Sequence, residues 1–282
     1  MAGSAKNSPR ATAGEYKVLA IDLGGTLTKV GLVGEQGEIY RTAVFKTGAM
    51  GRFSDFVVRI AALFNAWKEE LGSAPLAMGV GAPNASSLTG NMENPPNFDW
   101  GSRVPLLQSL TRHWDLPAFL TNDANAAAIG EMIYGSAVGM KNFVIITLGT
   151  GLGSGIVVNG EVVYGHDGFA GEVGHVQVYE DGRMCGCGHR GCFETYASAS
   201  GLRRTVFELL CSETTSTKLR NVSFNDMTAK MIADAAKEGD QIAIEAFNIT
   251  AKILGMKLAD TVAHTSPEAI FLFGGLTNAG DM

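Results

Sequence analysis

Three things are scarce in this sequence of 282 residues: cysteine, clustered positive charge and long apolar runs. Without a dense basic run, and with a net charge of −6, neither nucleic acid nor an anionic membrane is expected as a partner. The longest apolar runs have the length of strands, so no segment is expected to span a membrane. The first residues, MAGSAKNSPRATAG, lack the apolar stretch of a secretory signal. We therefore expect residues 1–15 to be a disordered leader and the protein to be cytoplasmic.

The few cysteines are spaced for a metal site rather than for disulfides. Cys185, Cys187 and Cys192 are crowded together, whereas Cys211 stands alone. With His175 they offer three thiolates and one imidazole, a closed tetrahedral set that suits Zn²⁺. Because a closed set leaves no position for a reactive water, we interpret the zinc as structural. One further residue remains a competing ligand, namely His189.

Apolar residues and glycine are abundant, and they recur in the same order. Hydrophobic residues make up 46% of the chain and charged residues 18%, as in a globular protein with an ample core. The segment IDLGGTLTKVGLV (21–33) has a partner in ITLGTGLGSGIVV (146–158), and each is predicted to be a strand, a glycine-rich turn and a second strand. The bland alternative is two ordinary hairpins. Two turns of one layout favour phosphate binding, because glycine leaves the backbone N–H groups accessible.

The order of the predicted elements repeats in the two halves: three strands, helix, strand and helix, and then again. This repetition predicts two similar α/β domains with a cleft between them, toward which both glycine turns point. We place a small α/β domain at 16–122 and a large α/β domain, with the zinc loop, at 123–282. The predicted strands are 16–23, 29–33, 38–46, 76–82, 117–123, 142–149, 153–159, 161–165 and 268–275; the main predicted helices are 53–71, 104–114, 201–210, 226–237 and 240–264.

The two glycine turns are the first candidate sites. In D-x-G-G-T-x-x-K, which runs from Asp22 to Lys29, the carboxylate of Asp22 can hold Mg²⁺ through water. Gly24, Gly25 and Thr26 would donate N–H and hydroxyl groups to phosphate. The second turn, G-T-G-x-G-x-G, is glycine-dense at a cost in backbone entropy, which favours a close approach to a ligand.

Two polar segments are candidates for binding the group that accepts the phosphate and for activating it. In T-N-D-A-N-A-A-A, either Asn122 or Asp123 is a natural cap for the helix that follows. Asp123 is equally a candidate base for an alcohol that attacks a phosphoryl group, although a helix N-terminus lowers a carboxylate pKa. In the loop from Asn84 to Asp99, Asn97 suits a hydroxyl partner because it both donates and accepts; a solvated turn is the alternative.

Taken together, DLGGTLTK, NDANAAAIGE, LGTGLGSG, EVGH and CGCGHRGCFE resemble the ROK family of repressors and sugar kinases. The resemblance runs from about Lys17 to Asp281. It implies the two-domain actin-like ATPase fold with ribonuclease H-like repeats. It also implies a glucokinase-like phosphotransferase that uses ATP and Mg²⁺ and carries structural Zn²⁺. We expect a sugar substrate and a homodimer.

The resemblance also assigns roles to individual residues. Asp123 matches the catalytic base, and the sugar-binding positions match Asn97, Asn122, Asp123, Glu172, His175 and Glu194. His175 would contact the sugar through one side of its ring and zinc through the other, with Cys185, Cys187 and Cys192 as the remaining ligands. The first phosphate loop matches Gly24, Gly25 and Thr26, between Asp22 and Lys29, and the second matches Gly149, Thr150 and Gly151. The pair that borders the adenosine matches Gly274 and Gly275.

Two departures from the family pattern concern the ends of the chain. Family members usually continue through further helices after the glycine pair, so we expect a C-terminal tail beyond Met282 to be missing. Repressor members carry a DNA-binding helix-turn-helix before the first strand, and the residues preceding Lys17 do not resemble one.

The expected reaction is ATP-dependent phosphorylation of the 6-hydroxyl of a hexose, with glucose as the first choice. N-acetylmannosamine, N-acetylglucosamine, fructose and allose are competing sugars, and polyphosphate is a competing donor. A non-catalytic sugar-sensing regulator is the alternative from a different class, although a sensor would need neither Asp123 nor the phosphate turns. If zinc is bound, it is expected to fix the loop that carries Glu172 and Glu194.

Overall fold

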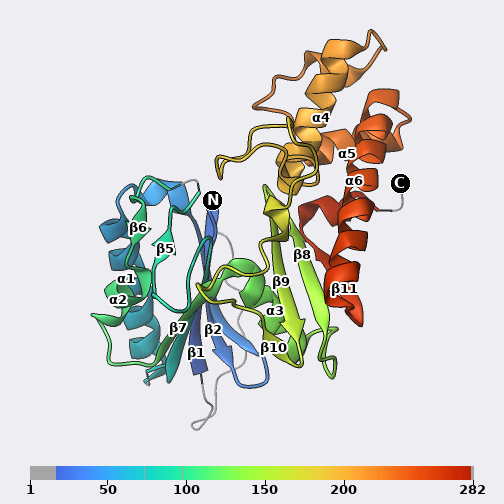
Figure 1. The fold of residues 1–282 in the computed structure, drawn as a ribbon. Coiled ribbons are helices and arrows are strands. Elements are labelled where there is room, and N and C mark those ends of the chain that lie inside the picture. Colours follow the sequence, from blue (N-terminus) through green and yellow to red (C-terminus); the bar gives the residue numbers. More distant parts are fainter. Residues whose placement is uncertain (1–16, 73, 97, 281–282) are drawn as a thin grey trace. The chain divides into compact units, whose positions relative to one another are not determined.

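A computed structural model describes residues 17–72, 74–96 and 98–280 of the chain (Figure 1). The chain divides into two compact units, each with its own hydrophobic core. Unit 1 comprises Met1–Val138 and Tyr164–Ala170, and unit 2 comprises Gly139–Val163 and Gly171–Met282. The leader expected at 1–15 lies outside the described residues, and the domain boundaries inferred from sequence stay predictions. No helix in the described part of the chain is long and apolar enough to cross a membrane.

Unit 1 is built on a five-stranded sheet with the order β3-β2-β1-β4-β7. The hairpin partners β1, β2 and β3 are antiparallel, whereas β4 and β7 join the sheet in parallel. Side chains alternate between buried and exposed along β1, as expected for the period of two in a strand. The strands are β1 (Lys17–Leu23), β2 (Leu27–Gly34), β3 (Ile39–Lys46), β4 (Ala77–Ala82) and β7 (Ala118–Asn122), with the small pair β5 (Met92–Glu93) and β6 (Arg103–Val104) in the long loop.

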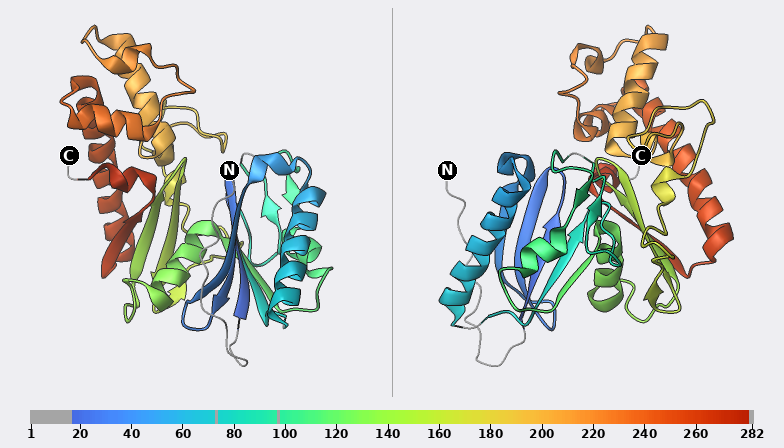
Figure 2. Two further views of the ribbon diagram at one scale, coloured as in Figure 1. Left: turned by 180° about the vertical axis from the view of Figure 1, so that it is seen from behind. Right: turned by 60° about the vertical axis from the view of Figure 1, so that its left-hand side comes forward.

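Helices cover both faces of this sheet, with α1 (Phe53–Leu71) and α2 (Leu106–Thr111) on one face and α3 (Asp123–Tyr134) on the other (Figure 2). The helix α1 buries Phe56, Ile60, Phe64 and Trp67, which share one face at helical spacing. It ends at Leu71 and is capped by Gly72, whose φ of 67° is the left-handed conformation that favours glycine after a helix.

Unit 2 contains a four-stranded sheet with the order β10-β9-β8-β11, and its helices α4, α5 and α6 pack against one another (Figure 1). The strands are β8 (Phe143–Leu148), β9 (Leu152–Val158), β10 (Glu161–Val162) and β11 (Ala269–Phe273); the helices are α4 (Ala199–Ser212), α5 (Ala229–Lys237) and α6 (Gln241–Thr265). Single turns of 3-10 helix are η1 (Thr47–Met50), η2 (Val173–His175), η3 (Phe193–Thr195), η4 (Lys218–Asn221) and η5 (Gly275–Ala279).

The two sheets repeat one topology, which confirms the internal repeat expected from the sequence. The order β3-β2-β1-β4 corresponds to β10-β9-β8-β11, and in both sheets the first long strand has an antiparallel hairpin partner on one side and a parallel strand on the other. One predicted strand is shorter than expected: 161–165 pairs only over Glu161–Val162. The chain then turns away at Gly165, whose φ is 69°.

Candidate functional site

The first glycine turn joins β1 to β2 and is closed by its own backbone. The N–H of Gly24 donates to the carbonyl of Leu27 at 3.1 Å. A Cβ at Gly24 would lie 2.8 Å from that carbonyl oxygen, so the tight turn requires glycine. The next two N–H groups, those of Gly25 and Thr26, donate to no group within the described residues. The turn therefore presents two adjacent backbone donors without partners.

Thr47, in η1 outside the turn, donates hydrogen bonds to two carbonyl groups of the turn. The Thr47 hydroxyl donates to Gly24 O at 2.7 Å, and the Thr47 N–H donates to Thr26 O at 3.0 Å. Sequence reasoning missed Thr47. The signal lay in the strand register: β2 and β3 pair Leu27 with Lys46, which places the next residue beside the turn.

Asp22 and Lys29 face each other across the β1–β2 hairpin. They are register partners, and Lys29 Nζ lies 3.2 Å from Asp22 Oδ2. Both side chains are well exposed, so this ion pair contributes little to folding stability. It leaves the carboxylate of Asp22 beside the turn and accessible, as a magnesium ligand must be.

The second glycine turn joins β8 to β9 and repeats this arrangement with a different support. The N–H of Gly149 donates within the turn, to Gly151 O at 3.0 Å. The N–H groups of Thr150 and Gly151 have no partner in the part of the chain that the structure describes. The unpartnered donors thus occupy the same two positions as in the first turn.

The support of the second turn comes from the N-terminus of α4. The first two N–H groups of that helix, on Ala199 and Ser200, donate to Gly149 O at 2.9 Å and to Thr150 O at 3.4 Å. Helix N-termini have unsatisfied N–H groups, and here the carbonyl groups of the turn accept from them. Gly274, directly after β11, lies against the same turn: a Cβ there would be 2.4 Å from Leu148 O. Its neighbour Gly275 begins η5.

Asp123 is the first residue of α3, and Asn122 is the N-cap. The Ala124 N–H is shared between Asn122 Oδ1 and Asp123 Oδ1, each at 2.8 Å. The side chain of Asp123 reaches solvent, yet desolvation by the surrounding protein raises the pKa of its carboxyl group, and the negative charge of Asp22 raises it further. The hydrogen bond from Ala124 lowers the pKa but does not outweigh desolvation. The pKa of the Asp123 carboxyl group is therefore raised, not lowered as its position at a helix N-terminus had suggested.

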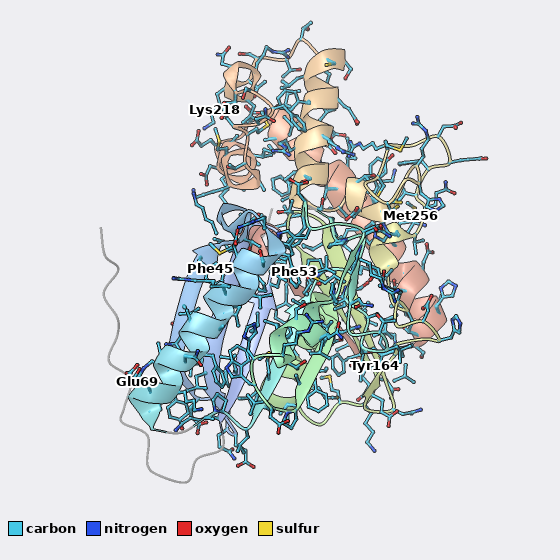
Figure 3. The ribbon with its side chains drawn as sticks, turned by 90° about the vertical axis from the view of Figure 1, so that its left-hand side faces the viewer. Phe45, Phe53, Glu69, Tyr164, Lys218 and Met256 are labelled. Carbon is cyan, nitrogen blue, oxygen red and sulfur yellow. The ribbon has the colours of Figure 1, made fainter. Side chains whose placement is uncertain are left out.

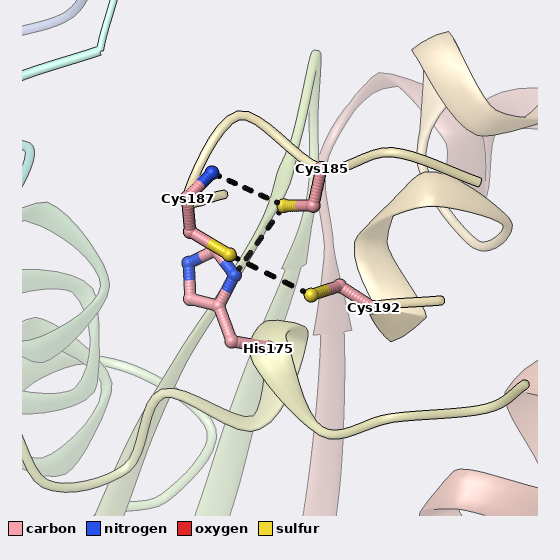
Figure 4. Close-up of side chains that lie close together, drawn as sticks. All are labelled: His175, Cys185, Cys187 and Cys192. Carbon is pink, nitrogen blue, oxygen red and sulfur yellow. Dashed lines mark hydrogen bonds between the residues drawn. The ribbon is translucent and has the colours of Figure 1, made fainter. Parts of the chain in front are cut away.

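The predicted zinc ligands come together. One ligand atom from each of His175, Cys185, Cys187 and Cys192 lies within 4.8 Å of all the others (Figure 4). The thiols of Cys187 and Cys192 are 3.6 Å apart, close to the edge of about 3.8 Å that Zn–S bonds of about 2.3 Å give in a tetrahedron. Nδ1 of His175 faces Cys185 Sγ at 3.7 Å. His189 is exposed and is not a member of this group.

Burial raises the pKa of the thiol of Cys185, and likewise that of Cys192. Without a nearby positive charge both groups would therefore stay protonated and poor as ligands. A bound cation favours the thiolates, so the donor set and its burial fit a zinc site.

Arg183 holds the segment that leads into this cysteine cluster. Its guanidinium makes a bidentate pair with Glu208 of α4, at 2.8 and 2.6 Å, and donates to Thr195 O at 2.6 Å. It also lies 4.3 Å from the centre of the Tyr196 ring, and only 9% of its side chain is exposed. Arg183 therefore fixes η3 and the start of the cysteine loop through groups other than the metal ligands.

The two predicted glutamates lie in segments of unit 2 that are held by hydrogen bonds, and Glu194 contacts the cysteine cluster. The hydroxyl of Ser154 donates to Gly171 O and accepts from the Val173 N–H at 3.0 Å, so it contacts the backbone on both sides of Glu172. Glu194 lies in η3, where Oε1 accepts from Cys185 Sγ at 3.0 Å and Oε2 from the Leu152 N–H at 3.4 Å. Unit 2 thus brings Glu172, His175, Glu194 and the second turn together.

Asn97 lies outside the described residues, but its neighbours form an aromatic cluster at one end of α1. Trp100 packs against Phe98 with 4.6 Å between ring centres and against Phe53 with 5.4 Å, and its Nε1–H donates to Gly51 O at 3.0 Å. Figure 3 shows Phe53 and Phe45 at the end of α1 opposite Glu69. The long polar loop is therefore anchored by aromatic packing, a feature its polar composition did not predict.

The chain that forms this arrangement of two sheets of one topology, two glycine turns and a Cys/His cluster is similar to known proteins in sequence and in fold. The ROK family matches residues 18–282. A glucokinase of Thermotoga maritima is 35% identical over 95% of this chain and 84% of its own length. The crystal structure of a glucokinase from Streptomyces griseus, in complex with glucose and AMPPNP, superposes with a TM-score of 0.79 at 33% identity, covering 94% of this chain and 85% of that one. More distantly, a putative xylose repressor of Caldicellulosiruptor is 29% identical over 94% of this chain and 67% of its own length.

The fold is the two-domain actin-like ATPase fold, with a Cys/His cluster that fits a zinc site. The chain belongs to the ROK family. Within that family, its matches to several curated glucokinases make it a sugar kinase, a phosphotransferase.

Proposed function

We propose that this protein transfers the γ-phosphoryl group of ATP to the 6-hydroxyl of glucose. The observation that carries the proposal is the pair of glycine turns, each of which leaves two adjacent N–H donors without partners in the described residues. Such donors suit phosphate oxygens. The choice of glucose and of ATP rests on the relatives: the matched glucokinases, and the Streptomyces griseus enzyme that was solved with glucose and AMPPNP.

Each unit would contribute its own set of contacts. Unit 1 supplies the first turn, Gly24 to Thr26, together with the sugar contacts Asn97 and Asn122 and the base Asp123. Unit 2 supplies the second turn, Gly149 to Gly151, and Gly274 and Gly275 on the adenosine side. Its sugar contacts would be Glu172, His175 and Glu194; His175 is a member of the Cys/His cluster and Glu194 contacts Cys185 of that cluster.

In the proposed reaction, Asp123 accepts the proton of the 6-hydroxyl as that oxygen attacks the γ-phosphorus. The bond between the γ-phosphorus and the bridging oxygen breaks, and ADP leaves with the bonding electrons. The raised pKa makes the carboxylate of Asp123 a stronger base than an ordinary aspartate. Asp22 would hold Mg²⁺ through water, and the ion would neutralise charge on the phosphates; Lys29 would stay paired with Asp22.

His175, Cys185, Cys187 and Cys192 would hold a structural Zn²⁺. Its role would be to fix the loop around Glu194. A four-ligand protein set leaves the ion no open position, so no step of the phosphoryl transfer is assigned to it.

The test is ADP release in a coupled assay with ATP–Mg²⁺ and a panel of glucose, fructose, allose, N-acetylglucosamine and N-acetylmannosamine. We expect release with glucose, and a rate about a thousandfold or more lower with Asp123→Asn under the same conditions. Release with an N-acetylhexosamine alone would move the assignment to that sugar, as in the putative N-acetylmannosamine kinase of Listeria monocytogenes, whose structure is 25% identical with a TM-score of 0.76. Phosphorylation with polyphosphate but not ATP would change the donor.

A sugar-sensing regulator is the second candidate, favoured by one observation: the chain also matches xylose repressors and a ROK-family transcriptional regulator structure at 26% identity. Calorimetry separates the two. Glucose binding without turnover, by zinc-loaded and folded protein with any donor, would support the sensor and refute the kinase.

A further inference from the structure

Thr47 contacts the first glycine turn in a way that fixes the direction of one of its unpartnered donors. In a trans peptide the C=O and the N–H point in opposite directions. The carbonyl of Gly24 and the N–H of Gly25 belong to one peptide unit, and every described peptide bond is trans. Because the Thr47 hydroxyl holds Gly24 O at 2.7 Å, the N–H of Gly25 points away from Thr47.

The hydroxyl itself is locked by a second threonine. Thr28 Oγ1 lies 2.9 Å from Thr47 Oγ1. The single hydroxyl hydrogen of Thr47 goes to Gly24 O, so Thr28 is the donor in this pair. Thr28 is 0% exposed and Thr47 2%, so both hydroxyls are shielded from water.

The second turn shows the same device with backbone groups. There the N–H groups of Ala199 and Ser200 hold Gly149 O and Thr150 O, so the N–H groups of Thr150 and Gly151 point away from the start of α4. In both turns the carbonyl of the first glycine is held, so the N–H of the next residue is oriented through the same peptide unit. A side-chain hydroxyl holds Gly24 O in unit 1 and the N–H of Ala199 holds Gly149 O in unit 2, where Ser200 holds a second carbonyl, Thr150 O.

We propose that Thr47 is a positioning residue for the nucleotide: its hydroxyl pre-orients the Gly25 N–H toward a phosphate oxygen. The proposal rests on the proposed function, because it needs the first turn to bind phosphate. It does not touch the sugar. Removing the hydroxyl should therefore weaken nucleotide binding and leave sugar binding unchanged, whereas a general loss of structure would weaken both.

The decisive variant is Thr47→Val, which keeps the shape and the backbone N–H but loses the hydroxyl. We expect the KM for ATP, and the Kd of the non-hydrolysable analogue AMPPNP measured by calorimetry, to rise about tenfold, the scale of a lost buried hydrogen bond. The KM for the sugar should change less than about twofold. Thr47→Ser should restore the wild-type values because it retains the hydroxyl.

Thr28→Val is the matched control. It removes an equally buried hydroxyl from the same pair but leaves the bond from Thr47 to Gly24 in place, so the Kd of AMPPNP should rise clearly less than in Thr47→Val. If Thr47→Val does not fold, Thr47→Ala gives the same comparison.

Three results would overturn the proposal: an AMPPNP Kd within twofold of wild type in folded Thr47→Val, equal losses of ATP and sugar affinity, or equal effects of Thr28→Val and Thr47→Val. Failure of the proposed function is distinguishable. A wild-type protein that binds AMPPNP but phosphorylates no sugar refutes the kinase and leaves the Thr47 comparison in force. A wild-type protein that does not bind AMPPNP refutes both.

Discussion

The two glycine turns have the same layout and different supports, and the difference shows how one geometry is maintained in two ways. In both, the first glycine N–H is used within the turn and the next two N–H groups are left without partners among the described residues. The first turn depends on the side chain of Thr47. The second depends on backbone N–H groups of α4, which only a substitution to proline would remove. Unit 1 should therefore be the more easily disabled half.

The largest expected effect falls on a group that only unit 1 supplies. Asp123→Asn keeps the shape of the side chain and a cap on Ala124, but it cannot accept a proton. We expect turnover to fall by about a thousandfold or more, in line with general-base contributions, while the Kd values of sugar and AMPPNP stay within a few-fold. Steady-state kinetics and calorimetry measure the two. Retained turnover would show that Asp123 is only a cap.

A glycine substitution in each turn compares the turns directly. In Gly24→Ala the new Cβ would meet the backbone oxygen of Leu27 at 2.8 Å, and backbone cannot move cheaply. In Gly151→Ala the Cβ would meet Oε2 of Glu194 at 2.7 Å, the movable end of a side chain.

We therefore expect Gly24→Ala to raise the KM for ATP by tens of times, on the order of 2 kcal/mol of backbone strain. Gly151→Ala should raise it only a few-fold, and should chiefly raise the KM for the sugar because Glu194 is displaced. The reverse order of the two variants would mean that the second turn is the more constrained one.

Removal of zinc tests unit 2 alone. Removing the metal with a chelator, verified by metal analysis, should raise the Kd for sugar several-fold because Glu194 is held less firmly. The Kd of AMPPNP should not change if the first turn is intact. The effect is limited because Arg183 and Ser154 hold the flanking segments through groups that are not ligands. Unchanged sugar affinity in a verified metal-free sample would contradict a structural role for the ion.

The pH dependence tests the link between Asp22 and Asp123. Only the ionised carboxylate accepts a proton, and the pKa of Asp123 is raised, so kcat/KM should begin to fall at a higher pH than for an ordinary aspartate. Asp22→Asn removes a like charge, which lowers the pKa of Asp123 and should move this acid limb to lower pH. The position of the limb is the readout, because the loss of Asp22 also lowers the maximal rate. An unmoved limb would rule out the coupling.

The smallest effect on nucleotide binding is expected at α4, where backbone N–H groups hold the second turn. Ser198 caps α4 by accepting from the Gly201 N–H at 3.0 Å. Ser198→Ala should reduce the free energy of unfolding by about 1 kcal/mol, measured by urea denaturation. The KM for ATP should stay within about twofold, because Ala199 and Ser200 still donate to the turn. A large rise in that KM would show that the cap controls the turn.

Sequence patterns predicted those parts of the molecule that depend on local order. The hydrophobic spacing of α1, the alternation in β1 and the duplicated strand–turn–strand segment predicted the elements and the repeat, and the spacing of the cysteines predicted the cluster. Thr47, Ser154 and Arg183 could not be found in this way. Their roles depend on which segment lies beside which, and this follows from strand register and loop packing rather than from any motif.

The hydrogen bonds of Arg183 have a consequence for how the protein would acquire its metal. Arg183 is fixed on α4 and on η3 by hydrogen bonds that need no ion, and it stands two residues before Cys185. A ligand set arranged by the fold loses little conformational entropy when the ion arrives. Zinc would then enter and leave a folded protein, so a cell short of zinc would accumulate an intact protein that can be reloaded rather than an unfolded one.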